Sequence, residues 1–341
     1  MSSSTVAAEP LLTATSEAVA REAQAGLTAN PKTLSPWLFY DEAGSRLFEQ
    51  ITQLPEYYLT RTERGIFTTY ADDIIRHAAA SDLASSPALT LIELGAGTAT
   101  KTGILLAAAV RQQGSIVYQP VDVSESALAE ASENILANIP GVTVRCQVAD
   151  YTREPLPLDR LPNTRTLALY IGSSIGNFSP TDAVDVLSNL RDQLQPGDVL
   201  LLGTDLAPGP HKTTADLLAA YDDASGTTAA FNLNVLTRLN RDLGANFNIA
   251  AFGHKAIWNP TESRIEMHLE SLRPQTVTIP ATATTPKLTL HFRQGETIHT
   301  ENSHKFSPAA ISSLLSQSRF ATSQTWHDPN HLFAVTLATA L

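Results

Sequence analysis

Between residues 90 and 206 the sequence alternates short apolar segments with longer amphipathic ones. The apolar segments have the length of strands, and the segments between them have the length and apolar spacing of helices. Parallel strands need a long crossover connection, which is usually a helix. The alternation therefore predicts a parallel sheet covered by helices on both faces. The expected strands are residues 90–94, 116–123, 142–149, 166–172 and 198–206, and the expected helices are residues 101–112, 124–139 and 179–194, the last two capped by Ser124 and Ser179.

The segments outside this alternation follow other patterns. Residues 11–30 and 60–80 are predicted helices, and the aromatic-rich stretch between them is broken by prolines and a glycine, which indicates short helices and turns. A long helix is expected over residues 213–243, followed by alternating apolar residues typical of half-buried antiparallel strands. The C-terminal segment predicts a helix and two strands with a turn at residues 328–330, and we expect these strands to return to the first sheet.

These segments predict an α/β protein with two domains. A doubly wound, Rossmann-like domain is expected from residues 63–206 and 304–341, and an α+β domain is expected from residues 1–62 and 207–303. The second domain is then built from the N-terminal segment and an insertion. The chain has 341 residues, 43% of them hydrophobic, which is enough for a sizeable core.

Charge and cysteine content narrow the possible functions. The formal net charge of −11 makes the chain a poor partner for nucleic acids and anionic membranes, and no Cys/His spacing typical of a zinc site occurs. The N-terminus lacks a signal-peptide pattern, and no stretch is apolar enough to span a membrane. The single Cys146 fits a reducing compartment, and its strand-like setting predicts a buried, inert thiol. We expect a cytoplasmic protein, and a monomer because no long exposed apolar helix stands out.

The glycine-rich turn in "LTLIELGAGTATKT", residues 89–102, indicates a nucleotide site after the first strand. A triphosphate-binding P-loop requires glycine directly before the Lys101-Thr102 pair, and Thr100 stands there instead. A dinucleotide loop requires a third glycine after Gly95 and Gly97, and Thr100 again takes that position. Both kinds of site are disfavoured. The loop fits better the E-x-G-x-G turn of S-adenosylmethionine (SAM) enzymes, in which glycines let the backbone approach the cofactor.

Acidic residues after the next two strands strengthen the SAM interpretation. Asp122 ends the second strand, where a carboxylate can accept hydrogen bonds from both ribose hydroxyls, although it could instead cap the following helix. Asp150 and Tyr151 follow the third strand, where a carboxylate can bind the adenine amino group and a ring can cover the base. Open α/β sheets bind ligands at the carboxyl ends of their strands, which is where all of these residues are expected.

Several stretches together resemble a known family. They are "FYDEAGSRLFEQITQLPEYYLTRTE", "IELGAGTATKT", "PVDVS", "YIGSSIGN", "LLGTDL", "AYDDASGTTAAFNLNVLTRLNRDLGANF", "IEMHLES" and "TENSHKF". From Leu34 to the C-terminus the sequence is similar to the histidine-specific Nα-methyltransferases of ergothioneine biosynthesis. The resemblance implies a class I SAM-methyltransferase fold with a second, substrate-binding domain. It also implies transfer of three methyl groups from SAM to the α-amine of L-histidine, giving hercynine, without a metal.

The resemblance assigns residues to a cofactor site. The family commonly has phenylalanine where Tyr151 stands, and a tyrosine ring should stack equally well. The cofactor residues would be Gly95, Lys101, Asp122, Asp150 and Tyr151, with Tyr40 near the methyl-transfer site.

The resemblance also assigns residues to the two ends of the amino acid. Asn177 suits an amine that must lose its proton, because an amide donates and accepts without adding charge. The sequence leaves Tyr57 and Tyr58 as alternatives, and we take Tyr57. The α-carboxylate and amine would be bound by Tyr57, Asn177 and Tyr221, with the Gly172 backbone close to the amine and with Thr228 supporting Tyr221 or Glu301 through its hydroxyl; Tyr40 and Asn177 are the catalytic candidates.

The imidazole ring would be bound by Glu301 and Ser303. Their i, i+2 spacing places both side chains on one face of a predicted strand, from which a carboxylate and a hydroxyl can reach the two ring nitrogens. Met267 and Phe48 would line the apolar sides of the ring. An indole has one donor and no acceptor, so the carboxylate of Glu301 and the hydroxyl of Ser303 would be only partly satisfied by it. Met267 and Glu301 together therefore favour histidine over the tryptophan-type substrates of a related branch.

The sequence is compatible with other functions, and it differs from the family pattern at two places. The chain could be a methyltransferase of the same fold acting on tryptophan or another small amine, a non-catalytic protein that kept the fold, or a dehydrogenase. It departs from the family pattern at Leu59, where proline is expected, and in a longer segment over residues 273–290. We expect both departures to lie in loops near the substrate domain.

Overall fold

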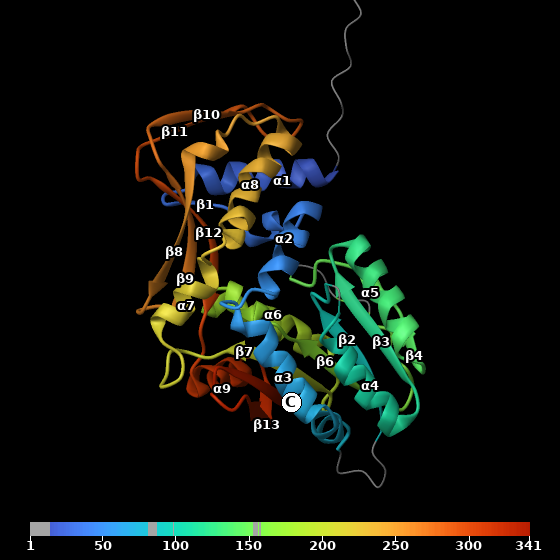
Figure 1. The fold of residues 1–341 in the computed structure, drawn as a ribbon. Coiled ribbons are helices and arrows are strands. Elements are labelled where there is room, and N and C mark those ends of the chain that lie inside the picture. Colours follow the sequence, from blue (N-terminus) through green and yellow to red (C-terminus); the bar gives the residue numbers. More distant parts are fainter. Residues whose placement is uncertain (1–13, 81–86, 98, 153–155, 157) are drawn as a thin grey trace, which may run out of the picture. The chain divides into compact units, whose positions relative to one another are not determined.

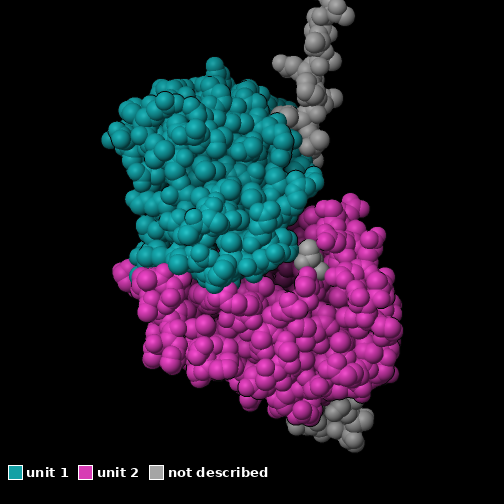
Figure 2. All heavy atoms as spheres, viewed as in Figure 1, with its two compact units in different colours: residues 1–57, 218–259, 265–302 teal, residues 58–217, 260–264, 303–341 magenta. Residues whose placement is uncertain are grey.

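The computed structural model describes residues 14–80, 87–97, 99–152, 156 and 158–341. These residues form two compact units, which are coloured separately in Figure 2. Unit 1 contains the described residues up to Tyr57 together with residues 218–259 and 265–302. Unit 2 contains the described residues of the ranges 58–217, 260–264 and 303–341. Each unit is therefore assembled from three separate stretches of the chain.

Unit 2 is built on an eight-stranded sheet with the order β13-β14-β7-β6-β2-β3-β4, in which β5 also pairs with β3. Strand β14 runs antiparallel to both of its neighbours, and the other pairs are parallel. The expected parallel sheet and the return of the C-terminal strands to it are both confirmed. The strands are β2 (Ala88–Leu94), β3 (Ile116–Asp122), β4 (Val142–Val144), β5 (Gln147–Val148), β6 (Thr164–Tyr170), β7 (Val199–Asp205), β13 (Phe320–His327) and β14 (Phe333–Ala340).

Helices pack on both faces of this sheet (Figure 1) because successive side chains of each strand point to opposite faces. In β6, Leu167 and Leu169 join one buried cluster with residues of α3, α4 and α5. Ala168 and Tyr170 join a second cluster with residues of α6 and α9. The doubly wound architecture is thus present. The helices are α3 (Tyr58–Ala79), α4 (Thr102–Gln113), α5 (Glu125–Asn138), α6 (Pro180–Gln193) and α9 (Pro308–Gln317).

Two predicted helix caps are confirmed. The hydroxyl oxygen of Ser124 accepts the N–H of Ala127 at 3.3 Å. The hydroxyl oxygen of Ser179 accepts the N–H of Asp182 at 3.2 Å. Each cap satisfies one of the backbone donors that the first turn of a helix leaves without a partner inside the helix.

The strand expected over residues 142–149 is interrupted, and the prediction for Cys146 is wrong. Strands β4 and β5 pair with β3 on either side of a gap that lies opposite Pro120, a residue with no N–H for a ladder. Cys146 lies in this gap and is exposed rather than buried. Its Sγ lies 3.6 Å from the carbonyl oxygen of Leu128.

Unit 1 combines helices with a four-stranded sheet of order β1-β12-β9-β8 and a separate β10–β11 hairpin. The single helix expected over residues 213–243 is wrong, because the chain breaks between α7 and α8. There the Asp223 carboxylate accepts the N–H groups of Thr227 and Thr228 at 3.0 and 2.7 Å. Gly226 adopts φ +76°, which favours glycine. The elements are α1 (Ala14–Thr28), β1 (Lys32–Thr33), η1 (Pro36–Phe39), α2 (Glu42–Thr52), α7 (Thr214–Tyr221, which crosses the unit boundary), α8 (Thr227–Leu243), η3 (Ile249–Ala251), β8 (Phe252–Asn259), β9 (Arg264–Ser271), β10 (Gln275–Ile279), β11 (Leu288–Phe292) and β12 (Thr297–His304).

The two departures from the family pattern do not lie simply in loops. Leu59 is buried in the first turn of α3, and residues 273–290 contain β10 and the start of β11. Residues 11–13 of the helix expected over 11–30 lie outside the described residues. Among the described residues, no helix is both long enough and apolar enough to cross a bilayer.

Candidate functional site

The glycine loop after β2 is held against the end of β3 in unit 2. Gly95 and Gly97 have φ values of +68° and +51°, which favour glycine. The N–H of Gly95 donates to the Val121 carbonyl at 2.9 Å, and that of Gly97 donates to the Asp122 carboxylate at 3.0 Å. A Cβ at Gly95 would lie 3.2 Å from the Tyr151 hydroxyl. Three of the predicted cofactor residues are therefore neighbours.

Asp122 has one structural role in the loop and capacity for another. Its two carboxylate oxygens accept the N–H groups of Gly97 and Ser124, at 3.0 and 2.9 Å. Each carboxylate oxygen carries two lone pairs, so a pair of hydroxyls can still be bound by the same group. The alternative as a helix cap and the predicted role toward ribose are thus compatible.

The predicted adenine residues follow β5. The Asp150 carboxylate accepts the N–H and the hydroxyl of Thr152 at 3.0 and 2.5 Å. The Tyr151 ring meets the Tyr170 ring edge-on, with centroids 5.7 Å apart and planes at 78°. Burial raises the pKa of Tyr151 to about 12, so the phenol is neutral at physiological pH. The backbone, carboxylates and ring of this region have the chemistry that a nucleoside cofactor requires.

Lys101 contacts a residue that sequence reasoning missed. Its ammonium forms an ion pair with Glu63 of α3, whose side chain is fully buried. The same carboxylate accepts the N–H of Gly172 at 2.9 and 3.1 Å from its two oxygens. Glu63 stands 38 and 109 residues from these partners, so no local pattern indicates it.

A second buried carboxylate lies beside the glycine loop. Glu93 of β2 accepts hydrogen bonds from the hydroxyls of Thr102, at 2.7 Å, and Tyr118. Burial raises the pKa of Glu93 to about 7, and the charge of Glu63 adds to this shift. The folded protein therefore binds a proton at Glu93 that the unfolded chain releases at lower pH.

This proton makes stability depend on pH. The pKa of Glu93 is raised in the folded protein above its ordinary value of 4.5. Proton binding at Glu93 therefore contributes its full share of the unfolding free energy below pH 4.5, and this share is lost as the pH rises through about 7. Glu93→Gln stays neutral, and we expect it to remove about 3 kcal/mol of this pH dependence. Urea unfolding of both proteins between pH 5 and pH 8 measures the difference. Equal pH dependence in the two proteins would contradict the shift.

Two further predicted residues of unit 2, Asn177 and Ser303, lie in segments that pack against each other. Asn177 ends the short helix η2 (Ser174–Asn177), and a Cβ at the preceding Gly176 would lie 2.9 Å from the His304 carbonyl oxygen. The η2 turn therefore packs directly on the backbone next to Ser303. Lys305 donates to the Ser303 hydroxyl at 2.8 Å.

Lys305 belongs to a buried charge network around Asp205. The Asp205 carboxylate accepts from the ammonium groups of Lys305 and Lys212, both at 2.7 Å. The Tyr58 hydroxyl lies 2.9 and 2.8 Å from its two oxygens. The side chains of Asp205, Lys212 and Lys305 are at most 2% exposed. Ser303 is thus hydrogen-bonded to a charge network that is buried away from water.

An aromatic cluster in unit 1 brings together four predicted site residues, namely three substrate candidates and Tyr40. The Phe48 ring meets those of Tyr40 and Tyr57, with centroids 5.8 and 6.3 Å apart and planes near perpendicular. Tyr57 in turn meets Tyr221 at 6.0 Å. Phe231, which the sequence analysis did not single out, lies 5.8 Å from Tyr40 and 6.0 Å from Phe48. Edge-to-face packing fixes the orientation of these rings.

The structure separates the two adjacent tyrosines. Tyr57 belongs to the aromatic cluster of unit 1, whereas Tyr58 donates its hydroxyl to Asp205 in unit 2. The Tyr58 hydroxyl therefore has a structural partner. This arrangement favours Tyr57 over Tyr58 as a substrate contact.

The remaining predicted residues lie on α8 and the four-stranded sheet. Met267 of β9 is 1% exposed, and its carbonyl accepts the Thr300 hydroxyl at 3.0 Å. Glu301 of β12 is half-buried, and its carbonyl lies 3.1 Å from the His299 ring. Thr228 is buried, and its hydroxyl makes no hydrogen bond to a described residue. The expectation that this hydroxyl supports Tyr221 or Glu301 is therefore not met.

A sequence profile described as histidine-specific, SAM-dependent methyltransferase matches residues 19–340 of this chain. The chain belongs to this family. The match decides between the ligands of the glycine loop, because the family depends on SAM rather than on a triphosphate or a nicotinamide dinucleotide. In this methyltransferase the sheet order, the antiparallel β14 and the glycine loop form a class I SAM-methyltransferase domain.

Two relatives of this methyltransferase match nearly its full length, and a third matches part of it. It is 43% identical over 323 residues to the histidine N-alpha-methyltransferase of Mycolicibacterium smegmatis, covering 94% of this chain and 95% of that protein. It is 40% identical over 322 residues to the histidine N-alpha-methyltransferase of Mycobacterium tuberculosis, covering 94% of each chain. It is also 33% identical over 229 residues to ergothioneine biosynthesis protein 1 of Schizosaccharomyces pombe, covering 65% of this chain and 28% of that protein.

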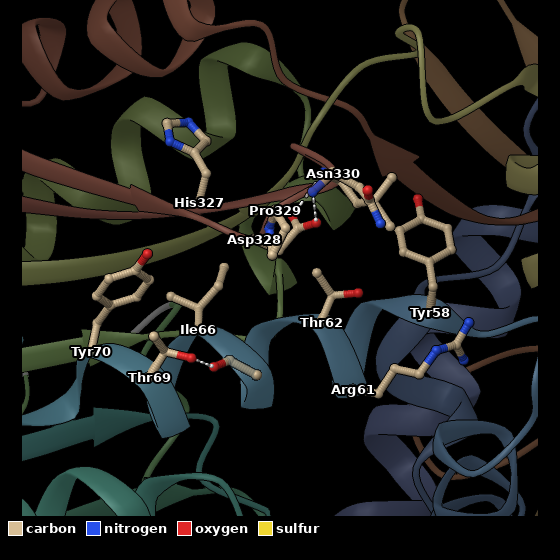
Figure 3. Close-up of a pocket in the computed structure, with 12 residues that line it drawn as sticks. Tyr58, Arg61, Thr62, Ile66, Thr69, Tyr70, His327, Asp328, Pro329 and Asn330 are labelled. Atoms are coloured by element: carbon tan, nitrogen blue, oxygen red, sulfur yellow. Dashed lines mark hydrogen bonds between the residues drawn. The ribbon is translucent and has the colours of Figure 1, made fainter.

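One cleft of the methyltransferase lies away from the predicted site residues. It has a volume of about 510 Å³ and lies between α3 and the turn that joins β13 to β14 (Figure 3). Tyr58, Tyr70 and His327 contribute rings to it, and the Asp328 carboxylate is occupied by backbone N–H groups. None of the predicted cofactor or substrate residues lines this cleft.

Three possible metal ligands meet on the four-stranded sheet, although the sequence shows no metal-site spacing. They are Glu266, His268 and His299, whose ligand atoms lie within 4.8 Å of one another. The two histidine rings are stacked, with centroids 4.6 Å apart and planes at 22°. Stacked rings direct their nitrogen lone pairs side by side rather than toward one point, so we assign no metal to this group.

Proposed function

We propose that this methyltransferase converts L-histidine to its Nα-trimethylated form, hercynine, in three methyl transfers. Two relatives named histidine N-alpha-methyltransferase, which match nearly the whole chain at 43% and 40% identity, carry the proposal. The name of the third relative supports a place in ergothioneine biosynthesis, of which this reaction would be the first step.

Bound SAM supplies an electrophilic methyl group, so that an N–C bond forms while the C–S bond breaks and the sulfur keeps the electron pair. The residues of unit 2 would hold the nucleoside. Asp122 would accept the ribose hydroxyls, Asp150 the adenine amino group, and Tyr151 would cover the base. Gly95 would let the backbone approach the cofactor, and Lys101 would bind its carboxylate.

The substrate amine must be presented without its proton, because a protonated amine has no lone pair with which to attack. Asn177 and the Gly172 backbone would orient the amine without adding a charge that holds it as a cation. Tyr57 and Tyr221 would bind the α-carboxylate, and Tyr40 would lie at the methyl-transfer site. Since these residues position the reactants, orientation would contribute to the rate enhancement.

The imidazole would be recognised by Glu301 and Ser303. On one face of β12 the carboxylate can accept the ring N–H, and the hydroxyl can bond the other ring nitrogen. Met267 and Phe48 would pack on the apolar sides of the ring. Thr228 is buried at the start of α8, and its hydroxyl would contact the substrate.

Two single-atom variants test the assignment of Tyr57. Tyr57→Phe is expected to raise the KM for histidine about 10-fold with little loss of stability, because it removes one hydrogen bond to a charged group. Tyr58→Phe is the matched control. It removes the hydroxyl that bonds Asp205, and we expect it to lower stability by about 2 kcal/mol while leaving that KM within a factor of about two. The reverse pattern would assign the substrate contact to Tyr58.

A mass-spectrometric endpoint assay tests the function itself. The purified protein is incubated with SAM and an equimolar mixture of the twenty amino acids. We expect histidine to gain three methyl groups and the other amino acids to remain unchanged. If tryptophan were methylated instead, the methyltransferase activity would stand and the assignment of histidine as substrate would be wrong. If no amino acid were methylated although the protein binds SAM, the chain would be a non-catalytic relative.

A further inference from the structure

The buried carboxylate of Glu63 reaches the carboxyl ends of three adjacent strands. It pairs with Lys101 in the loop after β2, and it accepts the N–H of Gly172 directly after β6. It also lies over Gly203 in β7, next to β6 in the sheet. Its side chain is fully buried, whereas that of Lys101 is 19% exposed. A helix of unit 2 therefore delivers one anion to the edge of the sheet where ligands of this fold bind.

The missing side chain of Gly203 leaves room in the sheet for the carboxylate of Glu63. A Cβ at Gly203 would lie 2.2 Å from the Glu63 Oε1 atom and 3.2 Å from the backbone of Ile171. Any residue other than glycine at 203 would displace the carboxylate or the chain beside it. The position of Glu63 is thus fixed by packing as well as by its ion pair.

We infer that Glu63 is a positioning residue of the methyltransferase, acting on the cofactor through Lys101 and on the substrate amine through Gly172. The inference rests on the proposed function for the second of these effects. Glu63 itself touches neither ligand in this assignment.

The effect through Lys101 follows from the number of its donors. A lysine ammonium has three N–H donors, and one is committed to Glu63. The ion pair fixes the ammonium in place and leaves two donors that can bind the carboxylate of the cofactor. Without Glu63, the flexible lysine stem would have to be ordered when the cofactor binds, and that ordering weakens affinity.

The effect through Gly172 follows from the polarity of the peptide. Its N–H is donated to Glu63, so the group that the Gly172 backbone can offer to a ligand is the carbonyl oxygen. A carbonyl accepts an N–H from an amine and so helps to direct the nitrogen lone pair. Gly172 has φ +76°, and its ideal Cβ would lie 3.5 Å from the Lys101 ammonium, so the two partners of Glu63 are themselves adjacent.

A double-mutant cycle with S-adenosylhomocysteine as the probe tests the first effect. We expect Glu63→Gln and Lys101→Met each to weaken its binding about 10-fold in calorimetry, consistent with the loss of one charge-assisted interaction. The double variant should bind no more weakly than Lys101→Met alone, because Glu63 acts through that lysine. Additive losses would overturn the inference, as would unchanged binding by Glu63→Gln.

Asp72→Asn is a matched control for the cycle. It also removes a carboxylate of α3 that pairs with a basic residue, Arg111 of α4, but the pair is exposed. We expect its binding to stay within a factor of about two of wild type, since exposed ion pairs contribute little.

Gly203→Ala gives a second test that keeps both charges. It should displace the carboxylate and weaken binding as Glu63→Gln does, and wild-type binding by Gly203→Ala would contradict the role of the carboxylate position.

The two effects separate in steady-state kinetics. Glutamine can still accept the Gly172 N–H, so Glu63→Gln should raise the KM for SAM and leave kcat with histidine within a factor of about three. Glu63→Ala removes both contacts and should lower kcat further, by about 10-fold. Equal kcat values for the two variants would restrict Glu63 to the cofactor and overturn its effect on the amine. Because binding of S-adenosylhomocysteine needs no amino acid, a wrong substrate assignment would leave the cycle interpretable.

Discussion

Replacing Glu301 with alanine is expected to lower kcat/KM for histidine by on the order of 100-fold. In the proposed imidazole site, the variant would lose a charged acceptor for the ring N–H, an interaction worth about 3 kcal/mol at the upper end for hydrogen bonds to charged groups. The loss should appear mainly in histidine-dependent parameters, because Glu301 lies on β12 of unit 1 and none of the cofactor residues does. Initial rates at varied histidine and saturating SAM measure the effect.

Glu270→Ala provides the control for this variant. Glu270 lies on the neighbouring β9 and pairs with Lys255 at 3.2 Å, but it is not part of the predicted imidazole site. We expect this variant to turn over histidine at close to the wild-type rate. Wild-type turnover by Glu301→Ala would remove Glu301 from its assigned role.

Replacing Asp205 with alanine is expected to cost about 3–5 kcal/mol of unfolding free energy, because it breaks a buried ion pair by removing one partner. Asp205 is the anion that two buried ammonium groups share, those of Lys212 and Lys305. Without it, both remain in the interior with little to offset their charge. Urea unfolding followed by tryptophan fluorescence measures the change, with Trp37 and Trp258 replaced by phenylalanine so that the signal comes from Trp326 of unit 2.

An exposed ion pair of the same unit is the control. Asp192 bonds Arg319 at 2.6 Å, and both side chains are more than half exposed. Asp192→Ala should change the unfolding free energy by less than about 1 kcal/mol. If Asp205→Ala were equally mild, the network around Asp205 would not be the source of stability that its burial implies.

The sheet of unit 2 could be predicted because its information is local. Each strand is an apolar segment that ends at a turn, and two helix starts carry a serine that can cap them. The break between α7 and α8 was missed because apolar residues continue on both sides of it. A new helix, α8, begins there with its first N–H groups bonded to the carboxylate of Asp223 and with Gly226 at positive φ, and neither effect changes the apolar periodicity.

The site could be predicted in part, for the same reason. Gly95, Asp122 and Tyr151 follow strands of one sheet, and strand order alone brings the ends of such strands to one edge. Glu63 and Lys305 could not be found in this way, because their roles depend on burial and on partners far along the chain. Isolated charged residues in a sequence are read as surface residues unless their burial is known.

The segmented construction of unit 1 has a consequence for how the chain is made. Helices α1 and α2 are synthesised before α8, the helix on which both pack, and α8 is not complete until residue 243 has been synthesised. Strand β1 can pair only later, because its partner β12 ends at His304. Unit 1 can therefore finish folding only after His304 has been synthesised. Nascent chains that stop before α8 would expose the apolar faces of α1 and α2, and such chains are the ones that chaperones would be needed to protect.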